Sequence, residues 1–471
     1  MNILLINPPR FNEVIANNPE VLESERGFNP PLGLLYLAGY LKKHSEYNVD
    51  IIDSQVERLD YTQLKNKIIK KKPDVVGITV MTLTLLDSLQ TARIVKSINK
   101  SIKVVFGGPH VHLYPEETIK FDHVDFLVLG EGEKNFKILL DNINDIDELT
   151  HNKGFVFIHS GKIVNTGVDV LHEDLDSLPF PARELTPYKK YSSLLAKRTP
   201  ITTIFTSRGC PYKCRFCDRP HLGTRFRAHS ADYVVREIQE CLKLGIHEFL
   251  VYDDTFTIDR NRVIEICKRI VDLKLDVGFD IRSRINTIDE EQLKWLKRAN
   301  CRGIHYGIEA GTKKILRVLN KGITLNAAKK IIDLTKKYKI QTLSYFMIGS
   351  PTETKEDILT TFKVMRWLNT DFTHLTILCP FPGTQIYFDG LEKGIIKSDV
   401  WRNFSNNPIR SFIPPYWSEN FELPELQELL KQGYQKFYMR GNFIFRKLLS
   451  LSSFGEFARK FKAGLKLLFM K

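Results

Sequence analysis

Three cysteines within eight residues are the densest group of reactive side chains in this sequence. Cys210, Cys214 and Cys217 lie in the segment SRGCPYKCRFCDRP, residues 207–220. Thiolates at CxxxCxxC spacing on one loop can surround a common metal centre. An iron–sulfur cluster is normally held by four cysteines, so three would leave one iron open to a second ligand. A zinc site would need a fourth ligand, and His221 is near enough in the sequence to supply it.

The elements that must position this loop are alternating strands and helices over residues 201–395. Helical stretches separate short β-branched runs, and the first helix has Ser230 as N-cap and ends near Gly245. The expected strands are TTIFTS, HEFLVYDD, DVGFDIRS, RGIHYGIEAG, QTLSYFMIG and HLTILCPF. Six such units predict a partial or full βα barrel, whose chemistry lies at the carboxyl ends of its strands. The first strand ends directly at the cysteine loop.

Residues 1–145 carry an earlier alternation of the same kind. The expected strands are NILLINP, VDIIDS, DVVGITV, KVVFGG and DFLVLGEGE. This pattern predicts an α/β fold with a doubly wound parallel sheet, flavodoxin-like, that binds its ligand beyond the carboxyl ends of the strands. Glycines there either admit a ligand to the backbone or simply make tight turns. The candidate residues at those ends are Pro8, Pro9, Arg10, Thr79, Thr82, Gly107, Gly108, Pro109, Gly130, Glu131 and Gly132.

Two further segments complete the organisation. Residues 146–200 are expected to connect the two α/β units, with a hairpin turning at Ser160-Gly161 followed by a stretch rich in proline and acid. Residues 396–471 form a C-terminal segment that ends in a basic amphipathic helix. In that helix Phe454, Phe457, Phe461, Leu465 and Leu468 share one face. The helix either lies on an anionic membrane or docks on the barrel.

Composition and charge narrow the class of protein. The 471 residues are 43% hydrophobic and 26% charged, as in a globular protein with a large core. From Lys431 onward ten basic residues face one acidic residue, which accounts for nine of the fourteen net positive charges. Residues 1–430 are therefore only mildly basic and show no obvious row of basic side chains, so a nucleic-acid partner is not expected. No apolar stretch is long enough for a membrane span, a signal peptide is not expected, and an odd number of clustered cysteines favours a reducing cytoplasm.

The cysteine motif, placed after the first barrel strand with Phe216 before its third cysteine, resembles the radical S-adenosylmethionine (SAM) superfamily. The resemblance implies a [4Fe–4S] cluster on Cys210, Cys214 and Cys217, with SAM on the open iron. One electron from a donor such as ferredoxin or flavodoxin would cleave SAM to methionine and a 5′-deoxyadenosyl radical. The SAM contacts that it implies are Phe216, Asp253, Asp254, Arg282, Ser283, Glu309, Met347 and Gly349.

The unit that precedes the barrel resembles the cobalamin-binding branch of the superfamily, through LLINPPR, NPPLGLLYLAGYLK, GGPH and LGEGE. That resemblance implies a cobalamin cofactor at the strand ends named above. The unit departs from other cobalamin proteins in lacking the DxHxxG motif, which supplies a histidine ligand to cobalt in those proteins. His110 and His112 do not stand in that motif, so they are expected to be surface or loop histidines. Related tRNA methylthiotransferases are set aside, because they need cysteines in the front unit and residues 1–209 contain none.

The activity that this resemblance implies first is methylation of an unactivated carbon in a small-molecule or lipid substrate. Oxidative cyclisation, of the anaerobic magnesium-protoporphyrin ester cyclase type, is the alternative chemistry. A non-enzymatic cobalamin- or redox-sensing protein is the alternative class. The expected location is the cytoplasm, with peripheral attachment to the inner face of the membrane if the tail binds lipid. Cys241, Cys267 and Cys301 are expected in the core, and Cys379 at the barrel mouth.

Overall fold

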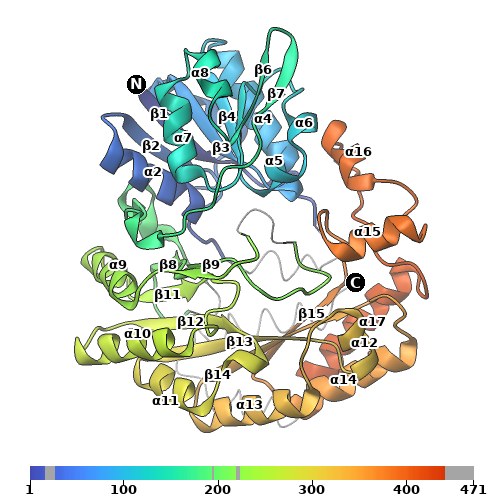
Figure 1. Cartoon of the computed structure of the whole chain (residues 1–471). Coiled ribbons are helices and arrows are strands. Elements are labelled where there is room, and N and C mark those ends of the chain that lie inside the picture. The colour runs from blue at the N-terminus through green and yellow to red at the C-terminus, as the bar shows by residue number, and fades with distance from the viewer. Residues whose placement is uncertain (16–26, 194–195, 219–222, 441–471) are drawn as a thin grey trace.

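The computed structural model describes residues 1–15, 27–193, 196–218 and 223–440. Two α/β lobes lie one above the other, the first in blue to teal and the second in green to orange (Figure 1). The predicted tail helix falls within residues 441–471, outside the described residues. No helix among the described residues is long and apolar enough to cross a bilayer.

The first lobe is built on a sheet with the order β2-β1-β3-β4-β5-β6-β7. Its first five strands are parallel, which confirms the predicted doubly wound fold. The predicted hairpin forms β6 and β7 and extends this sheet antiparallel, so the sheet runs on to Asn165. The strands are β1 (Asn2–Asn7), β2 (Asn48–Asp53), β3 (Val75–Thr79), β4 (Lys103–Gly107), β5 (Phe126–Val128), β6 (Phe155–His159) and β7 (Lys162–Asn165).

Helices cover both faces of this sheet because strand side chains alternate. Ile3 and Leu5 of β1 point to one face, where they join the core that α2 and α7 cover. Leu4 and Ile6 point to the other, which α3 and α4 cover. The helices of this lobe are α2 (Leu32–His44), α3 (Tyr61–Lys71), α4 (Leu85–Ile98), α5 (Pro109–Leu113), α6 (Pro115–Thr118), α7 (Gly132–Asp141) and α8 (Ile146–Thr150).

The second lobe is a six-stranded parallel sheet with the order β15-β14-β13-β12-β11-β8. The curved sheet is open, since β8 and β15 end it on opposite sides, so the predicted barrel is a partial one. Ser230 caps α9 by accepting from the backbone N–H of Tyr233, as predicted. The strands are β8 (Ile201–Ile204), β11 (Glu248–Val251), β12 (Gly278–Ser283), β13 (Cys301–Glu309), β14 (Gln341–Ile348) and β15 (Phe372–Ile377).

The helices of the second lobe pack on the outer face of its sheet. Cys241, Cys267 and Cys301 are buried in this core, as predicted. One more helix, α17, packs against β15 and α14. The helices are α9 (Ala231–Lys243), α10 (Arg260–Asp272), α11 (Glu290–Arg298), α12 (Lys313–Val318), α13 (Leu325–Lys337), α14 (Lys355–Leu368) and α17 (Leu423–Tyr438).

After β15 the chain returns to the first lobe. Helix α16 (Val400–Asn406) lies beside that lobe in Figure 1 and contacts α6, whereas α15 (Gln385–Glu392) lies lower and is bound to the cysteine loop, where Ile386 N donates to Arg215 O at 3.1 Å. Trp401 and Phe404 of α16 share a core with strands β1, β3 and β4. Cys379 belongs to the same core and is 7% exposed. It stands two residues after the carboxyl end of β15, and side chains of the core shared with the first lobe cover it there.

Candidate cluster and cofactor sites

A short antiparallel ribbon closes the base of the cysteine loop. It pairs β9 (Ser207–Arg208) with β10 (Arg227–Ala228), so that the two arginines lie opposite each other. Cys210 and Cys214 are buried and Cys217 is exposed, and none of the three forms a disulfide. On its other side the loop is held by α12, whose last turn accepts from the Arg215 backbone N–H at 3.1 Å through Leu319 O.

The cysteines do not form a mononuclear metal site in the described part of the chain. No three His, Cys, Asp or Glu side chains there converge closely enough to hold one ion. His221, the fourth ligand that a zinc site would need, lies outside the described residues. A cluster makes a different demand, because each thiolate binds its own iron and the sulfurs stand farther apart than around one ion. Three cysteines without disulfides on one loop fit that donor set.

Positive charge surrounds the buried cysteines. Arg284 Nη1 donates to Cys214 Sγ at 3.1 Å, and its guanidinium carbon stands 3.9 Å from the centre of the Tyr212 ring. Lys321 Nζ lies 5.8 Å from the centre of the Phe216 ring. Cations beside the cysteines would attract the negative charge of an iron–sulfur cluster bound there. The loop therefore fits an anionic cluster as well as supplying its ligands.

Two of the predicted SAM residues brace the barrel instead of facing the loop. The Asp253 carboxylate is fully buried and accepts from Thr206 N at 2.6 Å and from Ser207 Oγ at 2.6 Å. Burial raises the pKa of Asp253, although these hydrogen bonds oppose the shift. Ser283 Oγ is hydrogen-bonded to Thr257 Oγ1 at 2.7 Å. Both side chains thus fix strand ends, and Asp254 beside them is exposed.

Arg282, the predicted SAM contact, and Arg284 reach different places at the end of β12. The Arg282 guanidinium carbon stands 4.0 Å from the centre of the Tyr252 ring and faces a cavity between the lobes. Arg284, two residues farther, reaches the cysteines. Sequence reasoning missed Arg284, although the period of two along a strand puts both side chains on the same side of the sheet. Arg284, and not Arg282, is therefore the arginine of this pair that contacts a predicted cluster ligand.

Glu309 ends β13 in a left-handed conformation, with φ of +76°. Its carboxylate accepts from the buried Lys321 Nζ at 2.7 Å. A Cβ at Gly307 would lie 2.4 Å from the Glu309 carboxylate and 2.6 Å from Lys321 Nζ, so only glycine leaves room for this pair. Met347 packs in a cluster with Phe216, and Gly349 turns the chain after β14 with φ of +76°. Met347 and, through Lys321, Glu309 thus approach Phe216 of the cysteine loop, whereas Gly349 lies against Leu426 of α17.

A cavity of about 180 Å³ lies at the carboxyl edge of the first sheet. Its wall is mostly apolar side chains and glycine backbone, a surface that admits a large flat ligand closely. Six of the predicted cobalamin residues line it: Thr79, Gly107, Gly108, Gly130, Glu131 and Gly132. Pro8, Pro9, Arg10, Thr82 and Pro109 do not line it. Gly33, Leu34, Tyr36 and Leu37 of α2 line it as well, which the sequence did not predict.

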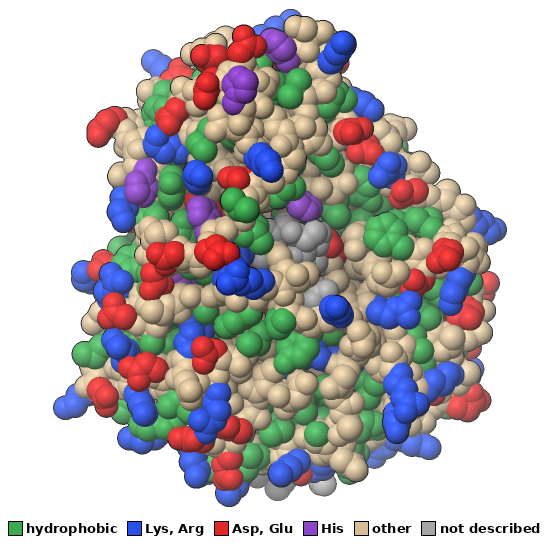
Figure 2. All heavy atoms as spheres, viewed as in Figure 1, with side chains coloured by type: hydrophobic (Ala, Val, Ile, Leu, Met, Phe, Trp, Pro, Cys, Tyr) green, Lys and Arg blue, Asp and Glu red, His purple; other side chains and the backbone are tan. Residues whose placement is uncertain are grey.

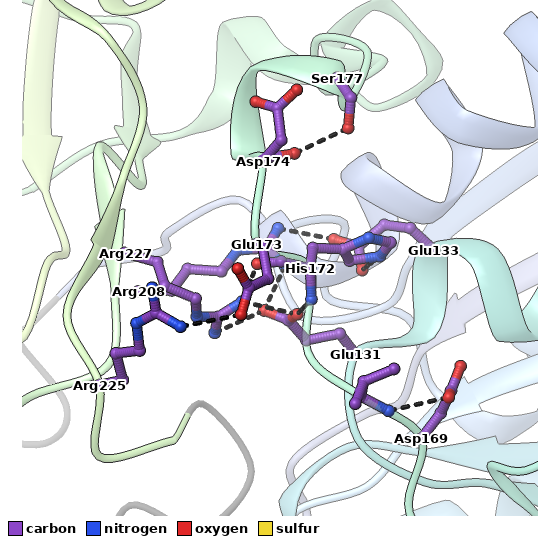
Figure 3. A network of polar contacts seen from close by, with 11 residues as sticks. Glu131, Glu133, Asp169, His172, Glu173, Asp174, Ser177, Arg208, Arg225 and Arg227 are labelled. Atoms are coloured by element: carbon purple, nitrogen blue, oxygen red, sulfur yellow. Dashed lines mark hydrogen bonds and ion pairs between the residues drawn. The ribbon is translucent and has the colours of Figure 1, made fainter.

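Glu131 joins this cavity to the cysteine ribbon through a buried ion network (Figure 3). It accepts from Arg208 Nη1 at 2.9 Å and from Arg227 through both carboxylate oxygens, at 2.9 and 3.0 Å. Arg208 Nη2 also donates to Glu133 at 2.6 Å. Burial alone would raise the pKa of Glu131, but the two guanidinium groups outweigh it and lower the pKa. The network spans both lobes and fixes Arg208, two residues before Cys210.

His110 is wholly buried, which corrects its expected place on the surface. It lies in α5, and its Nδ1 is 3.0 Å from Thr82 Oγ1. Burial lowers the pKa of His110 to about 3, so the ring is neutral. Thr82 is likewise engaged inside the lobe and does not reach the cavity. His112 is half-buried, and burial lowers its pKa too.

A second cavity, of about 350 Å³, lies between the lobes. Arg10 and Gln55 reach it from the first lobe, and Arg282, His305 and Tyr345 line it from the inner face of the barrel. Tyr252 accepts from Asn29 Nδ2 at 2.6 Å across this boundary. Burial lowers the pKa of His305 to about 4, so its ring is neutral at pH 7. The wall offers many hydrogen-bonding groups and two guanidinium cations.

Comparison with known proteins identifies the family. Residues 204–365 match the radical SAM superfamily and residues 21–140 match the B12 binding domain. An uncharacterised methyltransferase of Pyrococcus horikoshii is 33% identical over 458 residues, covering 96% of both chains. The chain belongs to the cobalamin-binding radical SAM family. Membership makes it an enzyme whose cofactors are a [4Fe–4S] cluster, SAM and cobalamin.

Other members of the family differ in the reactions that their names describe. An anaerobic magnesium-protoporphyrin IX monomethyl ester cyclase of Rubrivivax gelatinosus is 29% identical over 427 residues, 88% of this chain and 75% of that protein. Among solved structures, the methyltransferase TsrM of Kitasatospora setae, with cobalamin and a [4Fe–4S] cluster bound, superposes with a TM-score of 0.71 at 18% identity, covering 93% of this chain and 88% of that one. The cobalamin-dependent enzyme OxsB gives 0.75 at 16%, covering 98% and 70%. These structures confirm the two-lobed fold.

Proposed function

We propose that this radical SAM enzyme methylates an unactivated carbon of a small molecule. The observation that carries the proposal is the Glu131 network, because one carboxylate lines the cavity in the first lobe and also binds the strand that leads to Cys210. Methyl transfer from one cofactor to a radical made at another requires both to be held at a fixed separation. We place the functional units at residues 1–145 for cobalamin and 201–395 for the cluster and SAM, joined by 146–200 and followed by 396–471.

When bound, the cluster supplies the electron that cleaves SAM to a 5′-deoxyadenosyl radical, and cobalamin carries the methyl group. Cys210, Cys214 and Cys217 would hold the cluster. The pair of Glu309 and Lys321 holds a carboxylate in place for a hydroxyl-bearing ligand, since the Lys321 ammonium fixes one of its oxygens. Phe216, Met347 and Gly349 would border the SAM site, with Asp253, Asp254 and Ser283 bracing it.

The cavity between the lobes supports a polar small-molecule substrate. Its guanidinium groups and neutral His305 can bind an anion or a hydrogen-bonding group, whereas a purely apolar chain would leave them unsatisfied. Reduction would come from an external one-electron donor of the ferredoxin or flavodoxin type, which could approach a cluster bound here from the side of the exposed Cys217. On the face in Figure 2 basic and acidic side chains are interspersed, which does not suggest a nucleic-acid substrate.

Oxidative cyclisation is the second candidate, because the Rubrivivax cyclase matches 88% of this chain. Product mass separates the two reactions. Methylation adds one CH₂ to the substrate, and a methyl group labelled in SAM appears in the product. Cyclisation removes hydrogen and transfers no label. Incubating a candidate substrate with methyl-labelled SAM under anaerobic conditions therefore decides between them.

Filling the front cavity should abolish cobalamin binding without touching the cluster. At Gly107 an added Cβ would meet only Val128 O, at 3.8 Å, so a leucine can be accepted by the backbone while its side chain enters the cavity. After desalting, we expect Gly107→Leu to hold about one tenth of the hydroxocobalamin that the wild type holds, or less. A steric clash with one methyl-sized group weakens binding by about 1.4 kcal/mol, which is a tenfold loss of affinity. Ultraviolet–visible spectra of the reconstituted protein measure both cofactors.

Ala327→Leu, on the exposed side of α13, is the matched control and should retain cobalamin like the wild type. Wild-type protein that holds an iron–sulfur chromophore but no corrin would contradict the proposed methyl transfer. Equal retention by Gly107→Leu and wild type would move the cobalamin site away from this cavity.

We propose that the enzyme is cytoplasmic and that its tail contacts the inner face of the membrane. Deleting the residues after Phe445 removes the predicted amphipathic helix and its cations, so binding to anionic vesicles should fall by at least about tenfold. Co-sedimentation with vesicles containing phosphatidylglycerol measures it, with neutral phosphatidylcholine vesicles as the control. Equal sedimentation of the full and shortened chains would instead favour a tail that docks on the protein.

A further inference from the structure

Beneath the cysteine loop lies a group of buried charges that includes one more cation than anion among the described residues. Arg284 and Lys321 are 6% and 5% exposed, and Glu309, 6% exposed, is the carboxylate that pairs with Lys321. Arg284 has no carboxylate at hydrogen-bond distance in the described chain. Its partners there are a thiol, a carbonyl and an aromatic ring.

The position of Arg284 is fixed from three sides. Nη1 donates to Cys214 Sγ at 3.1 Å, Nη2 donates to the backbone carbonyl of Lys321, and the guanidinium plane stands 3.9 Å from the Tyr212 ring centre. Nε is buried without a partner among the described residues. A guanidinium bound in this way is pre-organised, so it points a full positive charge at one cysteine sulfur without choosing among rotamers.

We infer that Arg284 tunes the cluster by stabilising its reduced form. The inference rests on the proposed assignment of the cluster to Cys210, Cys214 and Cys217. Reduction moves one electron from an external ferredoxin- or flavodoxin-type donor to the cluster, the donor is oxidised by one electron, and no bond or proton changes place. The added negative charge is attracted by a buried cation and by a hydrogen bond to sulfur, and both raise the reduction potential of an iron–sulfur cluster.

Lys321 acts in the same direction but more weakly. Its ammonium is neutralised by Glu309 at 2.7 Å, so the pair presents a dipole, whereas Arg284 presents a net charge. The Lys321 carbonyl nonetheless orients the Arg284 fork, because Nη2 is anchored on it while Nη1 meets the sulfur. Arg284 is thus a positioning residue that acts on the cluster through Cys214.

The test measures the midpoint potential of the cluster by redox titration followed by electron paramagnetic resonance, without SAM. Arg284→Gln removes the charge and keeps a donor of similar reach, whereas Arg284→Lys keeps the charge but cannot hold both the sulfur and the carbonyl. We expect Arg284→Gln to have the most negative potential and Arg284→Lys an intermediate one. Arg317→Gln, on the exposed side of α12, should match the wild type.

Iron and sulfide analysis comes first, because wild-type protein without a four-iron cluster would overturn the proposed cofactor assignment and not the role of Arg284. An unchanged midpoint in Arg284→Gln would overturn the inference, and weaker SAM binding at unchanged midpoint would make Arg284 a ligand of SAM instead. If only Arg284→Lys assembles a cluster, a wild-type midpoint in that variant is the contradicting result. If neither Arg284→Gln nor Arg284→Lys assembles a cluster, although both melt at the wild-type temperature, Arg284 has a role in cluster assembly and the inference is overturned.

Discussion

Replacing Cys214 by alanine should reduce the production of 5′-deoxyadenosine from SAM to the level of the protein-free control. The thiol is the only iron ligand at that place in the loop, and without it the iron that it holds is lost from the cluster. The same result is expected for Cys210→Ala and Cys217→Ala. Chromatography of anaerobic reactions containing dithionite measures the nucleoside, and iron analysis measures the cluster.

Cys241→Ala is the matched control, since Cys241 is fully buried in the barrel core and far in the sequence from the loop. It removes one sulfur from the protein but none from the proposed cluster, so cleavage should persist. Normal cleavage of SAM by any one of the three loop variants would contradict the cluster assignment. Loss of cleavage in Cys241→Ala with a wild-type iron content would contradict the view that this cysteine is only a core residue.

The second large effect is expected from Glu131→Ala. Arg208 would keep its ion pair with Glu133, whereas Arg227, which is 5% exposed, would lose the two Glu131 oxygens to which it donates. Removing one partner of a buried ion pair costs about 3–5 kcal/mol because the remaining charge is uncompensated. Urea denaturation monitored by tryptophan fluorescence should show a correspondingly lower midpoint.

The control for this prediction is Asp232→Ala, which breaks exposed ion pairs with Arg236 and Arg269 and should lower the free energy of unfolding by less than about 1 kcal/mol for each pair. A double variant, Glu131→Leu with Arg227→Met, should recover part of the loss, because apolar replacement of a whole buried pair is often nearly neutral. If Glu131→Ala lowers the free energy of unfolding by no more than the surface control does, water must reach the Glu131 network and compensate the remaining charge.

The strands of both sheets could be predicted because their signal is local. They are short runs rich in β-branched residues, several of them bounded by glycine, proline or aspartate, and Ser160-Gly161 marks a hairpin turn by residue type alone. The cysteine spacing is local too. Both fold and family could therefore be inferred before any contact was known.

What could not be predicted depends on pairings across long stretches of chain. Glu131 meets Arg208 and Arg227 at sequence separations of 77 and 96, and neither sequence segment indicates the other. The sequence suggested Glu131 as a cobalamin residue and gave no sign of its ion pairs. His110 was misplaced because a short helix, α5, carries it inward. Arg284 was missed because neighbouring arginines in one strand cannot be ranked without the packing around them.

The return of α16 to the first lobe bears on how such a protein could have been assembled in evolution. Trp401 and Phe404 complete an apolar core whose strands come from the beginning of the chain. A gene fragment that encoded the first lobe alone would expose to water the apolar surface that Trp401 and Phe404 cover, and other chains could bind there. The first lobe is therefore not an exchangeable module. Recombination that carried it to a new catalytic partner would have had to carry the segment after the barrel as well.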